Sequence, residues 1–379
     1  MTELVEYCRA RTDEMVQLLT SLVEYETFTA EKAAVDRFGV YLSGLLEALG
    51  ARVTMLPRDA VGDILLARWN DDAPGKPITF VGHMDTVWPL GTLAQRPVRI
   101  EAGRLYGPGA IDMKAGLTVM ISAVRVLQER GEFPNRPIWA LVTSDEEIGS
   151  VHSQEVILDV ARQSGLCLVL EPATPEGAVK TWRKGVSDFQ VKVIGRASHA
   201  GGAPEAGINA VVELAHQILR LNALNDLRRG TSVSVTMARG GHTNNVIPDH
   251  AECYADVRFL TPDEAQRIRE AVHALQPVLP GAQLQITQGD ERPPLVRDET
   301  MRATFAQLKA IGERIGLSVY EDGSGGGSDG NFTASVGCPT LDGMGPTGEG
   351  LHAVHENVLI SSLPEKTALI AALLQQWEM

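Results

Sequence analysis

Three short apolar runs, each followed by histidine or acid, constrain the fold of this chain more than any other feature of its sequence. They are residues 77–81 before His83, residues 138–142 before Glu146 and Glu147, and residues 166–170 before Glu171. Apolar runs of this length, alternating with stretches of helical spacing, are typical of buried parallel strands. Open α/β sheets bind ligands at the carboxyl ends of such strands. The sequence therefore predicts a mostly parallel α/β sheet with flanking helices and a functional site along one edge.

The pattern of apolar residues changes after about residue 181. Apolar and polar residues alternate in three later segments, residues 186–194, 232–237 and 251–259, with helical spacing between them. Alternation indicates strands with one solvated face, and a chain of 379 residues is longer than single cores usually grow. We therefore expect a smaller α+β antiparallel-sheet domain at residues 182–292, inserted into a larger domain of residues 1–181 and 293–379.

Glycine-rich segments lie between the predicted strands and helices of the larger domain. One of them, residues 103–116, predicts a tight loop that holds Asp112 near the start of a helix. Another, residues 322–330, predicts a flexible loop or a backbone nest. His352 lies in a further loop before the C-terminal helix of residues 363–377. These loops add a carboxylate and an imidazole to the polar residues at the strand ends.

The charge and cysteine content exclude several classes of function. A net charge of −14 disfavours binding to nucleic acid or to an anionic membrane. The longest apolar runs are too short for a membrane span, and the first residues lack a signal-peptide pattern, so a cytoplasmic location is expected. Four scattered cysteines without a C-x-x-C pair predict reduced, buried thiols rather than a zinc ribbon or a redox motif.

The candidate site residues are histidines and acids at strand ends or in glycine-rich loops: His83, Asp112, Glu146, Glu147, Glu171 and His352. Taken singly, each would be interpreted as a hydrogen-bonded structural histidine or a solvated acid. Their recurrence at the same edge of the sheet favours a different interpretation, because converging carboxylates repel one another unless cations lie between them. Nitrogen and oxygen ligands of this kind suit a pair of zinc ions, with one carboxylate bridging both.

Short strings distributed over nearly the whole chain carry a family resemblance: GHMDTV, GPGAIDMKAG, TSDEEIGS, LEP, GRASHAGG, NNVIP, ADVRF, GGGSDGNF and HAVHE. In content and order they resemble the dinuclear-zinc exopeptidase family that includes carboxypeptidase G (glutamate carboxypeptidase), succinyl-diaminopimelate desuccinylase, acetylornithine deacetylase and aminoacylase. The strings TSDEEIGS, GRASHAGG and ADVRF are most similar to carboxypeptidase G. The resemblance implies the family's two-domain fold and its metal site.

For the larger domain, the resemblance implies a role for each candidate residue. His83 and Glu171 would be the terminal ligands of one zinc, Glu147 and His352 those of the other, and Asp112 the bridge. Asp85 would accept a hydrogen bond from His83 and fix its tautomer, and Glu146 would be the general base. Manganese or cobalt could replace zinc in the same set of ligands.

For the inserted domain, the resemblance implies contacts with the substrate. His199 would stabilise the oxyanion, reaching the site of a partner subunit in a homodimer formed through this domain. Arg258 would bind the terminal carboxylate of the substrate, Arg292 a second carboxylate, and Asn245 another part of it. Without the resemblance, the two arginines would be surface or hinge residues and Asn245 a turn residue.

The predicted function is zinc-dependent hydrolysis of an amide bond in a small peptide or N-acyl amino acid, releasing a carboxylate-bearing amino acid, with glutamate as the first candidate. An N-acyl-amino-acid deacylase, of the desuccinylase, acetylornithine deacetylase or aminoacylase kind, is the alternative. A non-catalytic binding protein on the same scaffold is a third interpretation. The preference for glutamate stays open, because Lys180, Arg183 and Lys184 do not match cleanly the lysine that carboxypeptidase G presents to that side chain.

Overall fold

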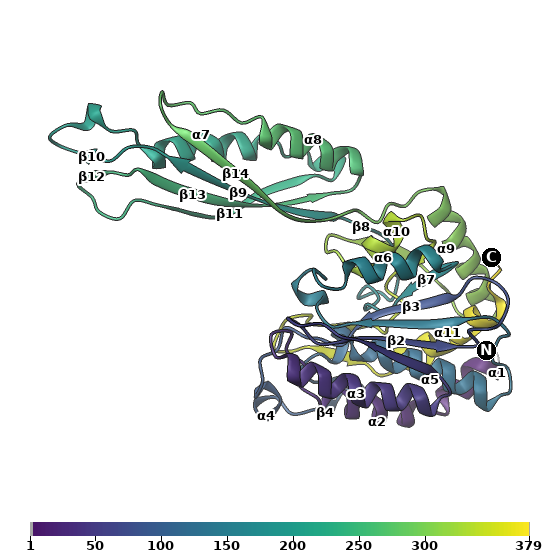
Figure 1. Ribbon diagram of the computed structural model, residues 1–379. Coiled ribbons are helices and arrows are strands. Elements are labelled where there is room, and N and C mark those ends of the chain that lie inside the picture. The colour runs from purple at the N-terminus through teal and green to yellow at the C-terminus, as the bar shows by residue number, and fades with distance from the viewer. Residues whose placement is uncertain (1–2, 379) are drawn as a thin grey trace. The chain divides into compact units, whose positions relative to one another are not determined.

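The computed structural model describes residues 3–378, which form two compact units (Figure 1). The first unit comprises the chain up to Trp182, Val296–Ser324 and the chain from Ser328 onward. The second unit comprises Arg183–Leu295 together with Gly325–Gly327. The sequence predicts an insertion at residues 182–292, close to these bounds. The role of this insertion in dimerisation stays a prediction. No helix within residues 3–378 combines the length and apolar character needed to cross a membrane.

A six-stranded sheet forms the centre of the first unit, in the order β1-β2-β6-β3-β7-β16. The strands are β1 (Arg52–Leu56), β2 (Ile64–Trp69), β3 (Ile78–His83), β6 (Ile138–Thr143), β7 (Leu166–Val169) and β16 (Thr340–Leu341). Strands β6, β3, β7 and β16 run parallel, whereas β2 is antiparallel to both β6 and β1. This mostly parallel sheet confirms the predicted fold class.

Helices cover both faces of this sheet, which is why its central strands β3 and β7 are buried along their whole length. The larger core contains residues of α1 (Glu3–Arg9), α2 (Thr12–Val23), α3 (Lys32–Ala48), α5 (Ala115–Glu129), α9 (Glu299–Arg314) and α11 (Ser362–Gln376). Residues of α6 (Gln154–Gln163) and α10 (Asp329–Ser335) belong to smaller clusters with the other face, and the two helices contact each other (Figure 1). In β3, for example, Ile78 and Phe80 join the larger core and Val81 a smaller one.

A small four-stranded sheet, in the order β17-β18-β5-β4, positions two of the candidate loops. Its strands are β4 (Arg99–Glu101), β5 (Arg104–Tyr106), β17 (Gly348–Glu349) and β18 (Asn357–Leu359). The loop that carries Asp112 follows β5, and the loop that carries His352 precedes β18. Because β18 pairs with β5, the two loops leave the sheet side by side.

The glycine-rich segment at residues 322–330 is more ordered than predicted. Its first part belongs to β15 (Glu321–Ser324), which pairs with β8 (Val179–Arg183). Its last part begins α10, where the side chains of Ser328 and Asn331 form a reciprocal capping box. The prediction of a flexible loop is therefore wrong at both ends of the segment.

The second unit contains a four-stranded antiparallel sheet, in the order β11-β13-β9-β14. Its elements are β9 (Gly185–Ile194), α7 (Ala210–Asn222), β11 (Ser232–Gly240), β13 (His250–Phe259), α8 (Pro262–His273) and β14 (Gln283–Arg292). In β9, Phe189, Val191 and Val193 pack in the core formed with the two helices, whereas Asp188 and Lys192 are exposed. A short ribbon of β10 (Ser198–His199) and β12 (Val246–Ile247) continues beyond one end of the sheet (Figure 1).

Candidate metal centre

Three neighbouring parallel strands, β6, β3 and β7, bring the first candidate residues together. His83 is the last residue of β3, Glu146 and Glu147 lie in a 3₁₀ turn (Glu146–Ile148) after β6, and Glu171 follows β7. The carboxyl ends of parallel strands meet at one edge of a sheet. The polar residues therefore converge because of the strand order.

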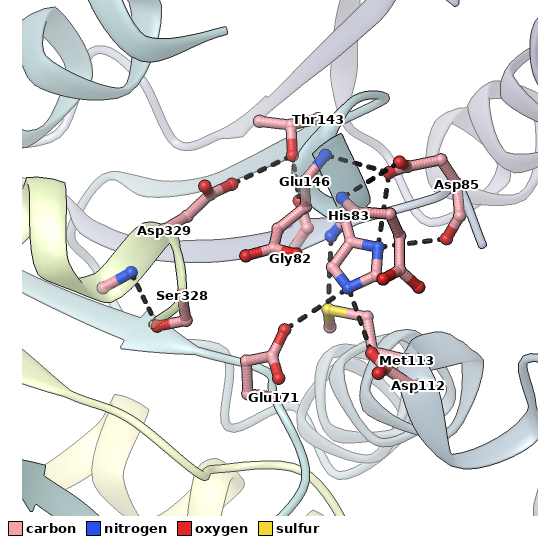
Figure 2. Close-up of polar contacts among 12 residues, drawn as sticks. Gly82, His83, Asp85, Asp112, Met113, Thr143, Glu146, Glu171, Ser328 and Asp329 are labelled. Atoms are coloured by element: carbon pink, nitrogen blue, oxygen red, sulfur yellow. Dashed lines mark hydrogen bonds and ion pairs between the residues drawn. The ribbon is translucent and has the colours of Figure 1, made fainter. Parts of the chain in front are cut away.

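The imidazole of His83 lies between carboxylates on both of its nitrogens (Figure 2). Its Nε2 atom is 3.2 Å from Asp112 Oδ1 and 3.3 Å from Glu171 Oε1, yet it makes no hydrogen bond within residues 3–378. Its Nδ1 atom is 3.0 Å from the backbone oxygen of Asp85 and 3.3 Å from Oδ1 of that residue. Burial favours the neutral ring, but the surrounding carboxylates outweigh it and raise the pKa of His83 well above its usual value.

Asp112 lies between the two histidines. Its Oδ1 atom faces His83, and its Oδ2 atom is 3.2 Å from His352 Nε2, which is also 3.1 Å from Glu147 Oε2. Hydrogen bonds to Asp112 and Glu147 raise the pKa of His352 to about 10, whereas burial raises the pKa of Glu147 to about 7. Acids and imidazoles packed this closely need added positive charge, which either protons or metal cations can supply.

The donor atoms are close enough to surround metal ions. His83, Asp112 and Glu147 offer atoms within 4.8 Å of one another, as do His83, Glu146 and Glu171. Glu147 Oε1 and His83 Nε2 are both buried without a hydrogen-bond partner within residues 3–378. Buried polar atoms normally have a partner, and the mixture of imidazole nitrogen and carboxylate oxygen suits zinc, manganese or cobalt. The residues present therefore fit a metal centre.

The buried carboxylate of Asp85 connects His83 to the turn of Glu146 and Glu147. Besides facing His83 Nδ1, it accepts a hydrogen bond from the backbone N–H group of Glu146 at 3.3 Å (Figure 2). The backbone N–H group of Glu147 donates another, also at 3.3 Å. The hydroxyl of Thr29 donates a third hydrogen bond at 2.8 Å. Asp85 thus orients a candidate ligand and the backbone of the candidate base together.

Glu356 is a buried carboxylate whose contribution the sequence analysis missed. It accepts hydrogen bonds from the N–H groups of Gly109, Ile111 and Asp112 at 2.9, 3.1 and 3.2 Å, and from Trp88 Nε1 at 2.7 Å. Burial raises the pKa of Glu356 to about 7. These contacts tie the end of the His352 loop to the loop of Asp112. The sequence carries no local signal for these contacts, because the partners of Glu356 lie far earlier in the chain.

Asp329 is a second buried acid that the sequence analysis missed, because it lies in the segment predicted to be flexible. It is only 2% exposed and accepts a hydrogen bond from the hydroxyl of Thr143 at 3.0 Å (Figure 2). The hydroxyl of Ser150 donates another hydrogen bond to it. These hydroxyls lie at the end of β6 and in the turn that follows Glu147. Asp329 therefore helps to hold the segment that carries the candidate base.

In the second unit, the ribbon of β10 and β12 brings His199 and Asn245 together. His199 pairs with Val246, and the backbone oxygen of Asn245 accepts a hydrogen bond from Ala200 at 2.9 Å. The exposed imidazole of His199 accepts two backbone hydrogen bonds at Nδ1, from Gly201 at 3.1 Å and Gly202 at 2.9 Å. An accepting Nδ1 places the ring proton on Nε2, which is then a hydrogen-bond donor.

Arg258 and Arg292 lie in one row of the second unit's sheet, because both pair with Val186 of the strand between them. The guanidinium of Arg258 forms a bidentate pair with Asp256, with Nε–Oδ1 at 2.9 Å and Nη2–Oδ2 at 2.8 Å. Arg292 is buried at the end of β14.

Three basic residues are candidates for facing the side chain of a glutamate substrate: Lys180, Arg183 and Lys184. Arg183 is buried and donates hydrogen bonds to the carbonyls of Gly326 and Gly327, both at 3.2 Å. Lys180 is also buried and belongs to the first unit, and Lys184 is half-buried in the second. Arg183 is thus held by backbone oxygens of its own unit.

Comparisons with known proteins agree with this fold and chemistry. Residues 79–376 match the profile of Peptidase family M20/M25/M40. The chain is 31% identical to carboxypeptidase G2 of Pseudomonas sp. (strain RS-16), over 97% of this chain and 90% of that protein. It is 30% identical to succinyl-diaminopimelate desuccinylase of Rhodospirillum centenum, over 96% and 97%. The crystal structure of aminopeptidase PepT from Bacillus cereus superposes with a TM-score of 0.77 at 24% identity, over 96% of this chain and 98% of that one.

Proposed function

Because the chain belongs to Peptidase family M20/M25/M40, we propose that it is a zinc-dependent hydrolase that releases a carboxylate-bearing amino acid from a small peptide or N-acyl amino acid. Membership of the family confirms the resemblance expected from the sequence and the assignment as a metallopeptidase or amidohydrolase. Glutamate is the proposed amino acid, which the 31% identity to carboxypeptidase G2 supports.

The observation that carries this proposal is the position of Asp112, whose two oxygens face different histidines. A carboxylate in this position is suited to bridge two zinc ions, with His83 and Glu171 on one side and Glu147 and His352 on the other. Two zinc ions held there would polarise the scissile carbonyl and acidify the attacking water. All the candidate ligands lie in the first unit, so this unit alone supplies the whole set.

Glu146 acts as the general base in this proposal. Its backbone is fixed by Asp85, and its carboxylate lies within 4.8 Å of donor atoms of His83 and Glu171. Glu146 takes a proton from the attacking water and returns it to the leaving amine. The neighbouring Glu147 faces His352 at 3.1 Å, which fits its proposed role as a ligand rather than as the base.

Arg258, Arg292, His199 and Asn245 recognise the substrate in this proposal. The two arginines are separated by two strand spacings, about 10 Å, and offer cations to the two carboxylates of a glutamate residue. His199, protonated on Nε2, donates a hydrogen bond to the oxyanion, and the adjacent Asn245 contacts another part of the substrate. The planar fork of a guanidinium matches the two oxygens of a carboxylate, as a carboxylate clamp requires.

The spacing within the second unit supports the proposal of a dimer formed through this unit. The row of Arg258 and Arg292 is at Val186, whereas the ribbon of His199 begins beyond Ile194, eight residues farther along β9. Eight residues of strand span about 26 Å, too far for both groups to contact one amino acid within a single chain. We propose that His199 serves a second copy.

An apolar surface on the second unit offers a place for that second copy. Val211, Val212 and Leu219 of α7 are 40%, 44% and 68% exposed, and Met237 of the neighbouring β11 is 46% exposed. Strand β11 is also an edge strand of its sheet, so its outer hydrogen-bonding groups are available for pairing. Analytical ultracentrifugation of L219E tests this proposal, which expects a dimer for the wild type and a monomer for the variant.

A substrate panel tests the proposed activity. N-acyl derivatives of glutamate, aspartate, ornithine and diaminopimelate would be assayed before and after removal of metal with a chelator. We expect the glutamate derivative to be hydrolysed fastest, and the activity to vanish without metal and return with zinc. Activity that survives complete metal removal would contradict the proposed mechanism.

Succinyl-diaminopimelate desuccinylase activity is the second candidate, supported by 30% identity over nearly the full length of such an enzyme. It would use the same candidate ligands and differ in substrate contacts. A clear preference for the diaminopimelate derivative in the same panel selects this alternative.

A further inference from the structure

Two of the four cysteines form a buried pair that the proposed reaction does not use. Cys167 lies in β7 and Cys338 lies just before β16, and their sulfur atoms are 3.6 Å apart. Both side chains are in a small apolar cluster with Val81, Ala161 and Val169. Cys8 and Cys253 belong to the larger core and to the core of the second unit, respectively.

The backbone holds the two thiols opposite each other. The N–H group of Cys167 donates to the carbonyl of Pro339 at 2.8 Å, and Thr340 is its partner in the parallel pairing of β7 with β16. The carbonyl of Cys338 accepts a hydrogen bond from the hydroxyl of Thr340 at 2.9 Å. A disulfide bond is about 2.05 Å long, so the sulfur atoms need to approach by about 1.5 Å. Side-chain rotations can supply much of that distance.

We propose that Cys167 and Cys338 are a modification site, an oxidisable dithiol that a peroxide converts into an intramolecular disulfide. Cys338 is the thiol that a small oxidant reaches first, because this residue is 7% exposed and Cys167 is fully buried. The hydrogen bond with Cys167 also lowers the pKa of Cys338, and the thiolate is the reactive form.

The oxidation balances with one peroxide molecule per pair. The sulfur of Cys338 attacks one oxygen of hydrogen peroxide, the O–O bond breaks, and a sulfenic acid and one water are formed. The sulfur of Cys167 then attacks the sulfenic sulfur, and the hydroxyl group leaves as a second water with the proton of the Cys167 thiol. Two thiols are oxidised to one disulfide, and the peroxide is reduced to two waters.

The bond would join two strands at the base of the candidate metal centre. Glu171 is four residues after Cys167, and its carbonyl accepts a hydrogen bond from Gly345 at 2.9 Å, in the segment that follows β16. The proposed disulfide would join β7 covalently to the segment just before β16. It would lie before the Glu171–Gly345 contact along both segments and would use no candidate ligand.

Thiol counting with peptide mapping tests the inference. Reduced full-length protein would be treated with a small excess of hydrogen peroxide, quenched, alkylated under denaturing conditions and digested with trypsin. We expect the count of free thiols to fall from four to two. The peptides of Cys167 and Cys338 should appear linked, with a mass about 2 Da below the sum of the separate peptides, and dithiothreitol should reverse the change.

Single variants provide the controls. C338S should keep its three thiols under the same treatment, whereas C253S, which leaves the pair intact, should lose two of its three. The inference is overturned if the wild type keeps all four thiols, if the lost thiols map to Cys8 or Cys253, or if C338S loses as many as C253S. Mapping of the wild-type protein decides the question even if a variant fails to fold.

Discussion

The main sheets of the two units differ in how many of their faces are buried. Helices cover both faces of the first unit's main sheet, and its strand ends hold the buried side chains of His83, Asp85 and Glu171. Helices of the second unit cover one face, and its residues His199 and Arg258 are exposed or half-buried. The first arrangement fixes charged groups with internal hydrogen bonds, and the second leaves these two groups partly accessible. Changes in the first unit should therefore affect metal binding and turnover, and changes in the second should affect substrate affinity.

Replacing the proposed base should have the largest effect on turnover. E146Q keeps the size of the side chain and removes its basicity, so we expect kcat to fall by ~100-fold or more, as general-base loss usually does. Metal content, measured by atomic emission, should stay near that of the wild type. E155Q, on the exposed surface of α6, is the matched control. Full activity of E146Q would refute the assignment of the base.

The same comparison predicts a different result for an arginine of the second unit. R258A would remove the charge-assisted hydrogen bond that we propose to the substrate, worth about 1.5–3 kcal/mol, so kcat/KM should fall by about 10- to 100-fold, chiefly through KM. The zinc content should not change. R239A, an exposed arginine on β11 of the same sheet, is the control. An unchanged KM for R258A would show that Arg258 does not bind the substrate.

Removing the charge of Glu356 should affect metal affinity rather than KM. In E356Q the amide N–H₂ faces donors of the Asp112 loop and Trp88, so the loop loses acceptors. Loss of a group that orients a ligand typically weakens metal binding by about 10- to 100-fold, which competition with a chromophoric chelator measures. E349Q, an exposed acid of β17 paired with Arg104, should bind metal as the wild type does. Equal affinities for E356Q and E349Q would show that the carboxylate has no such role.

The smallest expected effect is on the stability of the second unit. Glu264 accepts hydrogen bonds from Arg267, Thr231 and Arg229, with Arg267 the main cause of a pKa lowered to about 2. Because the pKa of Glu264 is lower in the folded protein, its ionised form stabilises the fold fully at pH values above the usual pKa of about 4.5. This contribution is lost as the pH falls toward 2. E264Q should therefore lower Tm by about 2–5 °C at pH 7, and the difference from the wild type should shrink below pH 4.5. Calorimetry would contradict this if the difference were constant with pH.

Strand ends were predictable from the sequence, whereas the buried acids that support them were not. An apolar run followed by His83 or Glu171 is a local pattern, and the fold class follows from repeating it. Glu356 and Asp329 act through partners more than 150 residues away in the chain, and no local pattern reports such contacts. The segment of residues 322–330 was misjudged because its glycines suggested flexibility, although Ser328 and Asn331 carry a capping signal.

The ends of the second unit lie next to each other. Arg183 and Leu295, its first and last main residues, exchange two backbone hydrogen bonds, N to O at 3.0 and 3.1 Å. A domain that leaves and re-enters its host at one point behaves as a cassette, because it can be gained, lost or exchanged as one piece without rerouting the host strands. Evolution can therefore exchange this insertion, and with it the residues proposed to bind substrate, while the residues proposed to hold metal stay under separate selection.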